Sequence, residues 1–430
     1  MNAAPVSPPA AFTRRGVAQN IAALFTGSAV AQGLTALTLL LTARQLGAMG
    51  YGQYASCLVA ASLSSIVFSL GQDLWLLRQG GRQPELVSEL ASAVLLNKFL
   101  IGLLWLGALL IIAPWLSQET FPAGLFRLAA LTVLVDGLFT SAVTALKSAL
   151  RNRLASLLEA ACDFTWLITT LLLIRDQVQN ASVYFLVRLV ALSIFLGAAL
   201  LILQRLFRLR RSWQVSRLAL EQSPPFAASE FLAWTALRLD VLIIALILGR
   251  DAVGLYSPAV GIVNALFWFP AAVYMVFVPV LSRLMDIKPS QAWQTAWRGF
   301  LLQAFLGLGT GALLFLGAGP LTSLLGESYA GSRQVLQTLS VLMFFKSLSF
   351  AAAAVLVAAG LQARRTLVQA AAVMLNACLN FLFLSRAGIL GAAWFYVASE
   401  ILLCAGYSAL AFQAWRANRQ PPPFHPSWPA

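Results

Sequence analysis

Residues 43–55 read ARQLGAMGYGQYA, and residues 238–260 read RLDVLIIALILGRDAVGLYSPAV. Both stretches contain Leu-Gly, four residues, Gly, one residue and Tyr, beginning at Leu46 and at Leu248. The two copies are 202 residues apart at every matching position. Each copy lies between two apolar runs of helical length. We interpret the pair as the trace of an internal duplication, with both halves in the same orientation.

The composition is that of a membrane protein. Of the 430 residues, 60% are hydrophobic and 10% are charged, whereas soluble domains are about 45–50% apolar and about 25% charged. A spanning helix needs about 20 mostly apolar residues. Charges and turn signals divide the chain into twelve predicted spans, at 16–43, 50–77, 85–113, 122–149, 153–174, 178–205, 226–248, 252–284, 290–317, 334–360, 363–386 and 389–416.

The predicted fold is therefore an all-α polytopic membrane protein with about twelve transmembrane helices in two six-helix lobes. The spacing leaves no room for a sizeable soluble domain, and the sequence contains no Walker-type GxxxxGK(S/T) pattern. Any energy source must then be an ion gradient, the substrate gradient or a partner.

The net charge of +14 is explained by topology. With a cytoplasmic N-terminus, 18 of the 29 Lys and Arg residues fall on the cytoplasmic side, 5 on the outside and 6 within spans. Short cytoplasmic loops of membrane proteins carry such an excess of basic residues. We expect both termini to be cytoplasmic and no nucleic-acid partner.

The longest polar interval between spans starts at Arg205 and contains five arginines followed by Pro224 and Pro225. It predicts a cytoplasmic linker between two halves. Arg14 and Arg15 precede an apolar run that is too long for a secretory signal, so we expect an uncleaved first helix. The predicted regions are a cytoplasmic tail at 1–15, an N-terminal lobe at 16–205, a basic linker at 206–225, a C-terminal lobe at 226–418 and a disordered Pro-rich tail at 419–430.

Cysteine and histidine usage argues against metal chemistry. Cys57, Cys162, Cys378 and Cys404 all lie in predicted spans, without metal-ligand spacing, and we expect buried thiols. The single histidine, His425, lies in the Pro-rich tail. We expect no metal, no cofactor and no catalytic residue.

Ionisable groups near the middle of spans are the candidate site, because such groups are costly in a bilayer and tend to face the bundle interior. They permit two interpretations: four buried ion pairs, or a water-filled cavity lined by charge. The basic candidates, for substrate binding, are Lys98, Arg188, Arg238 and Lys346. The acidic candidates, for ion coupling, are Asp136, Asp163, Asp240 and Glu400, together with Glu159. Asp73 is instead assigned to the end of a span, near Arg78.

Two spacings restrict the pairing. Arg238 and Asp240 are two residues apart, about 200° around a helix, and cannot pair with each other. Glu159 and Asp163 are four residues apart and share a face. Two adjacent carboxylates favour a shared proton or a bound cation, although salt bridges to other helices are an equal alternative.

The three cationic groups Arg188, Arg238 and Lys346 come from different spans. If they converge, they form a floor suited to phosphate, which arginine binds in a bidentate manner. The eighth span carries Pro270 and Pro279 within its apolar run. Proline kinks a helix, either statically or as a hinge for alternating access.

Several stretches resemble the polysaccharide transporter family, which includes the O-antigen flippases, within the multidrug, oligosaccharidyl-lipid and polysaccharide exporter superfamily. The resemblance covers nearly all of 16–416, and it rests on the four stretches at 43–55, 70–82 (LGQDLWLLRQGGR), 238–260 and 321–337 (LTSLLGESYAGSRQVLQ).

The resemblance implies two lobes around a central cavity lined by helices one, two, seven and eight. It implies flipping of a polyprenyl-pyrophosphate-linked oligosaccharide in the bacterial inner membrane, with coupling to H⁺ or Na⁺ and with polysaccharide polymerase machinery as a partner. Cationic cavity residues would screen the pyrophosphate, and Arg238 with Asp240 matches an Arg-x-Asp of the seventh helix. A multidrug or cation antiporter is the alternative. A membrane polymerase or glycosyltransferase is disfavoured by the short external loops.

Overall fold

The computed structural model describes residues 14–419, and the side chains from Val30 onward with a few exceptions. Two predicted segments lie largely outside this range. They are the tail at 1–15, of which only Arg14 and Arg15 are described, and the Pro-rich tail at 419–430, which includes His425. The α-helices are α1 (Arg14–Ser64), α2 (Ile66–Ser69), α3 (Gln72–Arg82), α4 (Val87–Ile112), α5 (Ala123–Ser148), α6 (Asn152–Arg175), α7 (Ala181–Phe207), α8 (Trp213–Gln222), α9 (Pro224–Ile247), α10 (Arg250–Leu266), α11 (Trp268–Ile287), α12 (Pro289–Leu325), α13 (Ser332–Ala358) and α14 (Gln362–Arg419). Three short 3₁₀ helices are η2 (Pro84–Leu86), η3 (Ala113–Trp115) and η4 (Glu327–Tyr329).

The predicted all-α polytopic fold is confirmed. Nine segments of the described chain are long and apolar enough to cross a membrane. Two of them hold two predicted spans each, since α1 is interrupted by non-helical backbone at Gly47 and α14 at Gly388. The 24-residue helix α9 supplies the seventh predicted span. Each of the twelve predicted spans therefore has a helical counterpart among the described residues.

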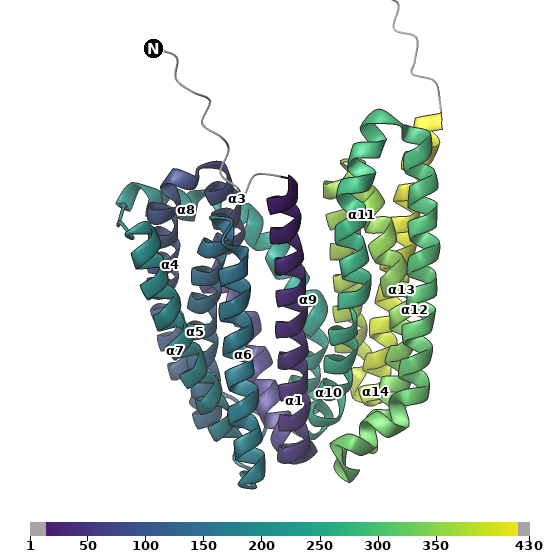
Figure 1. Ribbon diagram of the computed structural model, residues 1–430. Coiled ribbons are helices and arrows are strands. Elements are labelled where there is room, and N and C mark those ends of the chain that lie inside the picture. Colours follow the sequence, from purple (N-terminus) through teal and green to yellow (C-terminus); the bar gives the residue numbers. More distant parts are fainter. Residues whose placement is uncertain (1–13, 420–430) are drawn as a thin grey trace, which may run out of the picture. The chain divides into compact units, whose positions relative to one another are not determined.

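The helices form two compact units (Figure 1). The first unit comprises the described residues up to Ala265, with 320–333 and 384–389. The second comprises 266–319, 334–383 and the described residues from Leu390 onward. The boundaries of the two predicted lobes, with the linker at 206–225, stay a prediction.

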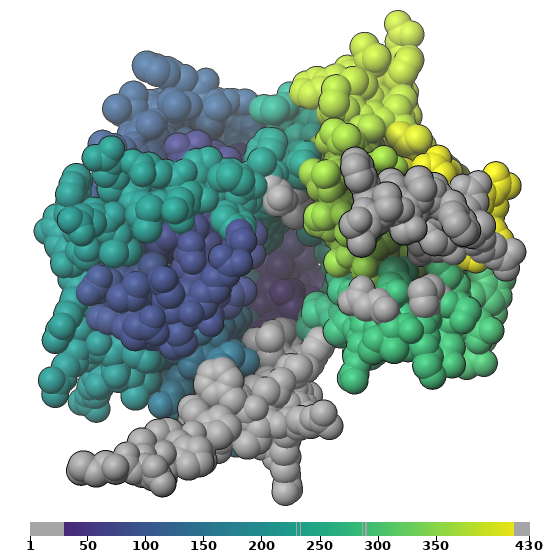
Figure 2. Space-filling model, turned by 90° about the horizontal axis from the view of Figure 1, so that it is seen from above, coloured from purple at the N-terminus to yellow at the C-terminus, as the bar shows by residue number. Residues whose placement is uncertain are grey.

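In the first unit, α1 packs on α6, and α5 packs on both α4 and α7. Large buried side chains such as Trp75, Leu146 and Leu192 form its core. At one end of this unit α8 lies beside α3, with α3 in indigo and α8 in teal (Figure 2). Gln222 joins these two helices, because its side-chain oxygen accepts a hydrogen bond from the Trp75 indole at 3.1 Å.

In the second unit, α13 packs against α11 and α14. Ala352 and Leu356 of α13 are buried with Leu403 and Tyr407 of α14. Leu281 of α11 is buried with Ala354 and Val355 of α13.

The two copies of the repeated sequence pack reciprocally on each other. A Cβ at Gly52 would lie 1.9 Å from the Arg250 carbonyl oxygen, and a Cβ at Gly254 would lie 1.9 Å from the Ala48 carbonyl oxygen. Ala48 and Arg250 occupy the same position of the two copies, as do Gly52 and Gly254. Only glycine permits this approach of backbone to backbone. The repeat therefore marks a pseudo-twofold contact inside the first unit.

Tyr54 and Tyr256 of the repeat have exposed fractions of 1% and 0% and lie in the protein interior. Cys57, Cys162 and Cys404 are buried as predicted, but Cys378 is exposed.

Candidate functional site

A cavity of about 230 Å³ lies within the first unit. Its lining comes from eight helices, α1 to α7 and α9. The first and second predicted spans, in α1, α2 and α3, and the seventh, in α9, all contribute to it, whereas the eighth predicted span supplies none of its lining residues. Six acidic or basic side chains line this cavity, namely Asp73, Lys98, Asp136, Arg188, Glu230 and Arg238.

A break in the second predicted span forms one wall. The sequence predicted a continuous helix over 50–77, but the helix ends at Ser64, and left-handed backbone at Leu70 (φ 47°) and Gly71 (φ 68°) follows α2. Ser62, Ser65 and Ser69 line the cavity beside this break. In a membrane protein, irregular backbone is tolerated where it is covered by protein or lines a cavity.

One end of the cavity contains the carboxylates of Asp73 and Glu230 and the amine of Lys98. Lys98 Nζ lies 2.6 Å from Asp73 Oδ2, and Ser141 Oγ donates a hydrogen bond of 2.6 Å to Asp73 Oδ1. Lys98 is only 1% exposed, so its charge is balanced by this contact. Asp73, assigned from the sequence to a span end near Arg78, lines the cavity and has the buried Lys98 as its ion-pair partner.

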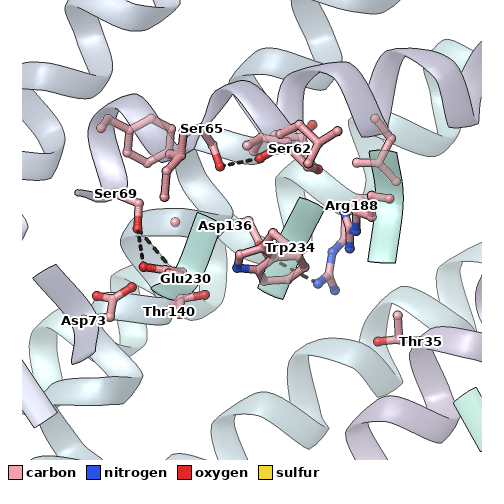
Figure 3. A pocket seen from close by; sticks show the side chains of 18 of the residues that line it. Thr35, Ser62, Ser65, Ser69, Asp73, Asp136, Thr140, Arg188, Glu230 and Trp234 are labelled. Atoms are coloured by element: carbon pink, nitrogen blue, oxygen red, sulfur yellow. Dashed lines mark hydrogen bonds and ion pairs between the residues drawn. The ribbon is translucent and has the colours of Figure 1, made fainter. Parts of the chain in front are cut away.

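Glu230 lies on α9 beside Asp73 (Figure 3). Ser69 Oγ lies 3.4 Å from Glu230 Oε2 and donates a long hydrogen bond to it. Among the described residues no Lys or Arg forms an ion pair with Glu230. This carboxylate therefore lines the cavity without a direct ion pair, and the charge of Lys98 acts on it from nearby.

The other end of the cavity contains Arg188. Its Nη1 lies 2.7 Å from Asp163 Oδ1, and its Nη2 lies 3.4 Å from Asp136 Oδ1. The guanidinium also lies over the Trp166 ring, 4.4 Å from the centroid. Arg188 thus joins α5, α6 and α7, and much of its charge is already neutralised.

Arg238 differs from the other basic candidates. In the part of the chain that the structure describes, it forms no ion pair with a carboxylate, and its guanidinium lies 4.7 Å from the centroid of the Trp234 ring. Asp240, two residues on, is 4% exposed and accepts hydrogen bonds from the Tyr256 hydroxyl at 2.5 Å and the Val241 amide at 2.8 Å. The expectation that Arg238 and Asp240 face different sides of the helix agrees with these contacts.

Lys346 and Glu400 belong to the second unit. Lys346 Nζ lies 3.0 Å from Glu400 Oε2 and 5.3 Å from the centroid of the Phe267 ring. The predicted cationic floor is thus represented by Arg188 and Arg238 in one cavity, and the participation of Lys346 stays a prediction.

The carboxylates Glu159 and Asp163 have separate cationic partners. Lys147 Nζ lies 2.7 Å from Glu159 Oε1, whereas Asp163 pairs with Arg188. Because each negative charge is compensated by a different helix, this geometry does not favour a cation bound between the two. The alternative interpretation, in which each carboxylate forms a salt bridge to another helix, describes Glu159 and Asp163.

The prolines of the eighth predicted span occupy different positions. The helix is interrupted at Phe267, between α10 and α11, and Pro270 lies in the first turn of α11, where a missing amide proton costs little. Its carbonyl accepts a hydrogen bond of 2.8 Å from Gln303 Nε2. Pro279 lies inside α11. A hinge role for either proline stays a prediction.

Glu230 and Trp234 were not among the candidate residues predicted from the sequence. Both line the cavity, and with Arg238 they occupy positions i, i+4 and i+8 of α9. This spacing places the three side chains on one helix face, and it could have been found within the predicted span at 226–248.

Residues 17–285 match the family model described as polysaccharide biosynthesis protein. The chain belongs to this family. The curated protein sequences contain no match to this member of the polysaccharide biosynthesis family.

Solved structures show the fold of this family member. It is similar to a multidrug resistance MATE family transporter of the MOP superfamily in the inward-facing conformation, with a TM-score of 0.66 and 14% identity over 90% of this chain and 95% of that chain. The outward-facing MATE structure matches with a TM-score of 0.62 and 12% identity over 93% of this chain and 96% of that chain. A MOP superfamily transporter from Pyrococcus furiosus matches with a TM-score of 0.60 and 12% identity over 94% of this chain and 97% of that chain. The chain therefore shares the fold of these membrane transporters.

Proposed function

We propose that the protein is a flippase that moves a polyprenyl-pyrophosphate-linked oligosaccharide across the bacterial inner membrane for surface polysaccharide synthesis. Both termini would be cytoplasmic. The family match supports the polysaccharide pathway, and the MATE-like fold supports transport. The substrate would come from the glycosyltransferases that build lipid-linked sugars and pass to the polymerase machinery.

Arg238 is the observation that carries this proposal. It lines the cavity from α9 and forms no ion pair among the described residues, although the charge of Asp136 acts on it from within the same cavity. Arginine binds phosphate oxygens through a planar fork of donors. Arg188 lines the same cavity and adds a second, partly neutralised guanidinium. The negative charge of a bound pyrophosphate would neutralise the positive charge of Arg238.

Transport would be driven by an H⁺ or Na⁺ gradient, since the connections between the described helices are too short to hold a nucleotide-hydrolysing domain. Among the predicted coupling carboxylates, Asp136 is the one that lines the cavity, with an exposed fraction of 49%. Glu230 joins it as a candidate, because it forms no direct ion pair in the described chain.

A multidrug or cation antiporter is the second candidate, and Glu230 is the observation that favours it. A carboxylate in a cavity attracts cationic compounds, whereas Arg238 repels them. The similar transporter from Pyrococcus furiosus is reported to have a binding pocket of reverse polarity that suggests a different function. The polarity of this cavity is therefore the property that distinguishes the two candidates.

Deletion of the gene followed by mass spectrometry of membrane lipids tests the proposal. A flippase predicts accumulation of the completed polyprenyl-pyrophosphate-linked repeat unit and loss of the surface polymer. Wild-type protein, but not the Arg238→Ala variant at equal abundance, should restore both. An unchanged lipid pool with increased sensitivity to cationic drugs would instead support the antiporter.

A further inference from the structure

Three cavity residues form a row along α9. Glu230, Trp234 and Arg238 are spaced by four residues, so they share a face of the helix, about 6 Å apart along its axis. All three line the cavity. A ligand lying along this face would meet a carboxylate, an aromatic ring and a guanidinium in that order, over about 12 Å.

The ring of Trp234 is held in place but only partly covered. Arg238 occupies one side, with its guanidinium carbon 4.7 Å from the ring centroid. The indole hydrogen-bonds the Glu230 side chain, and its nitrogen is on the side facing Glu230 (Figure 3). Trp234 nevertheless remains 45% exposed. A fixed aromatic surface is thus available to a ligand in the cavity.

Glu230 retains free acceptor capacity. A carboxylate has about four acceptor positions. Ser69 and Trp234 occupy part of this capacity. Because no cation pairs with Glu230 in the described chain, the remaining positions suit hydroxyl or amide donors of a ligand.

We propose that this row recognises the sugar attached directly to the pyrophosphate of the lipid carrier, an inference that rests on the proposed flippase function. Arg238 binds the phosphate next to the sugar, the C–H face of the pyranose ring packs on Trp234, and Glu230 accepts hydrogen bonds from its hydroxyl or acetamido groups. The cavity of about 230 Å³ is smaller than the roughly 300–1,000 Å³ of pockets for drug-sized ligands. It therefore takes the first sugar rather than the whole glycan.

The order of the three groups disfavours simpler ligands. A cationic amphiphile would be repelled by Arg238, and a purely apolar chain would leave both charges of the row without partners. A free phosphate would use Arg238 alone. Only a ligand with an anion, a ring and donor groups in sequence uses all three.

Binding of two short-chain carriers to the purified full-length protein tests the row. The probes are farnesyl pyrophosphate and farnesyl-pyrophosphoryl-N-acetylglucosamine, and Kd is measured by isothermal titration calorimetry in detergent. Wild type should bind the sugar-bearing probe about three- to tenfold more tightly, the range expected of one ring packed on an aromatic side chain. Trp234→Ala should abolish this preference, so that the variant binds the two probes with similar Kd values.

Matched variants separate the contributions. Arg238→Ala should weaken binding of both probes, and Trp234→Phe, which keeps an aromatic ring, should keep part of the preference. Glu230→Ala should reduce the preference more than Glu230→Gln, which keeps an acceptor oxygen. Trp115→Ala is the control, because Trp115 is 80% exposed outside the cavity, and it should behave as wild type.

The outcomes distinguish the two proposals. If wild type binds neither probe, the flippase proposal fails. If it binds both probes equally, or if Trp234→Ala keeps the preference, the row does not recognise sugar and the flippase proposal stands. Size-exclusion chromatography of each variant ensures that only folded protein is compared.

Discussion

Removing Arg188 should destabilise the first unit more than removing its main partner. The Arg188 and Asp163 side chains are 16% and 11% exposed and form an ion pair at 2.7 Å. Removing one member of a buried ion pair costs about 3–5 kcal/mol, because the other charge stays buried and uncompensated. Arg188→Ala leaves Asp163 in that state. Asp163→Ala costs less, since Arg188 keeps Asp136 at 3.4 Å.

The double variant makes this prediction quantitative. Arg188→Ala combined with Asp163→Ala removes both charges, so its loss in the free energy of unfolding should be smaller than the sum of the two single losses by about 0.5–3 kcal/mol. Unfolding is followed by circular dichroism during titration with SDS in mixed micelles. Additive losses, or a wild-type unfolding midpoint for Arg188→Ala, would refute the structural role of this pair.

Two further predictions use the same unfolding assay. Gly52→Ala should lower the free energy of unfolding by about 1–3 kcal/mol, because the added Cβ meets the Arg250 carbonyl oxygen at 1.9 Å. Gly33→Ala is the control and should not destabilise the protein, because nothing lies within 4 Å of its added Cβ. Equal stability of the two variants would contradict the reciprocal glycine contact. Tyr256→Phe should lower the free energy of unfolding by about 1.5–3 kcal/mol, since it removes a hydrogen bond to the buried carboxylate of Asp240. An unchanged unfolding midpoint would mean that this hydrogen bond contributes little to stability.

Span positions could be predicted from the sequence because apolar length and charge spacing are local properties. The predicted span at 153–174 corresponds to α6 (Asn152–Arg175), and the span at 122–149 corresponds to α5 (Ala123–Ser148). The repeated pattern also predicted a real relation, since Gly52 and Gly254 contact each other's repeat.

Charge partners could not be predicted in the same way. Asp73 and Lys98 are 25 residues apart, and only the three-dimensional packing of α3 on α4 brings them together. The break after Ser64 was also missed, because its apolar and small residues continue the pattern of a span. Glu230 was overlooked since it lies near the start of its predicted span, where a charge is ordinary.

Reconstitution of Arg238 variants tests the central claim most directly. Proteoliposomes carrying a fluorescent prenyl-pyrophosphoryl sugar report its movement between leaflets by the fraction accessible to an external quencher. Hydrogen bonds between charged groups are worth about 1.5–3 kcal/mol, so Arg238→Ala should slow transport about tenfold or more. Arg127→Ala, at an exposed position of α5 outside the cavity lining, should leave it unchanged. Transport at the wild-type rate by Arg238→Ala would contradict pyrophosphate binding in this cavity.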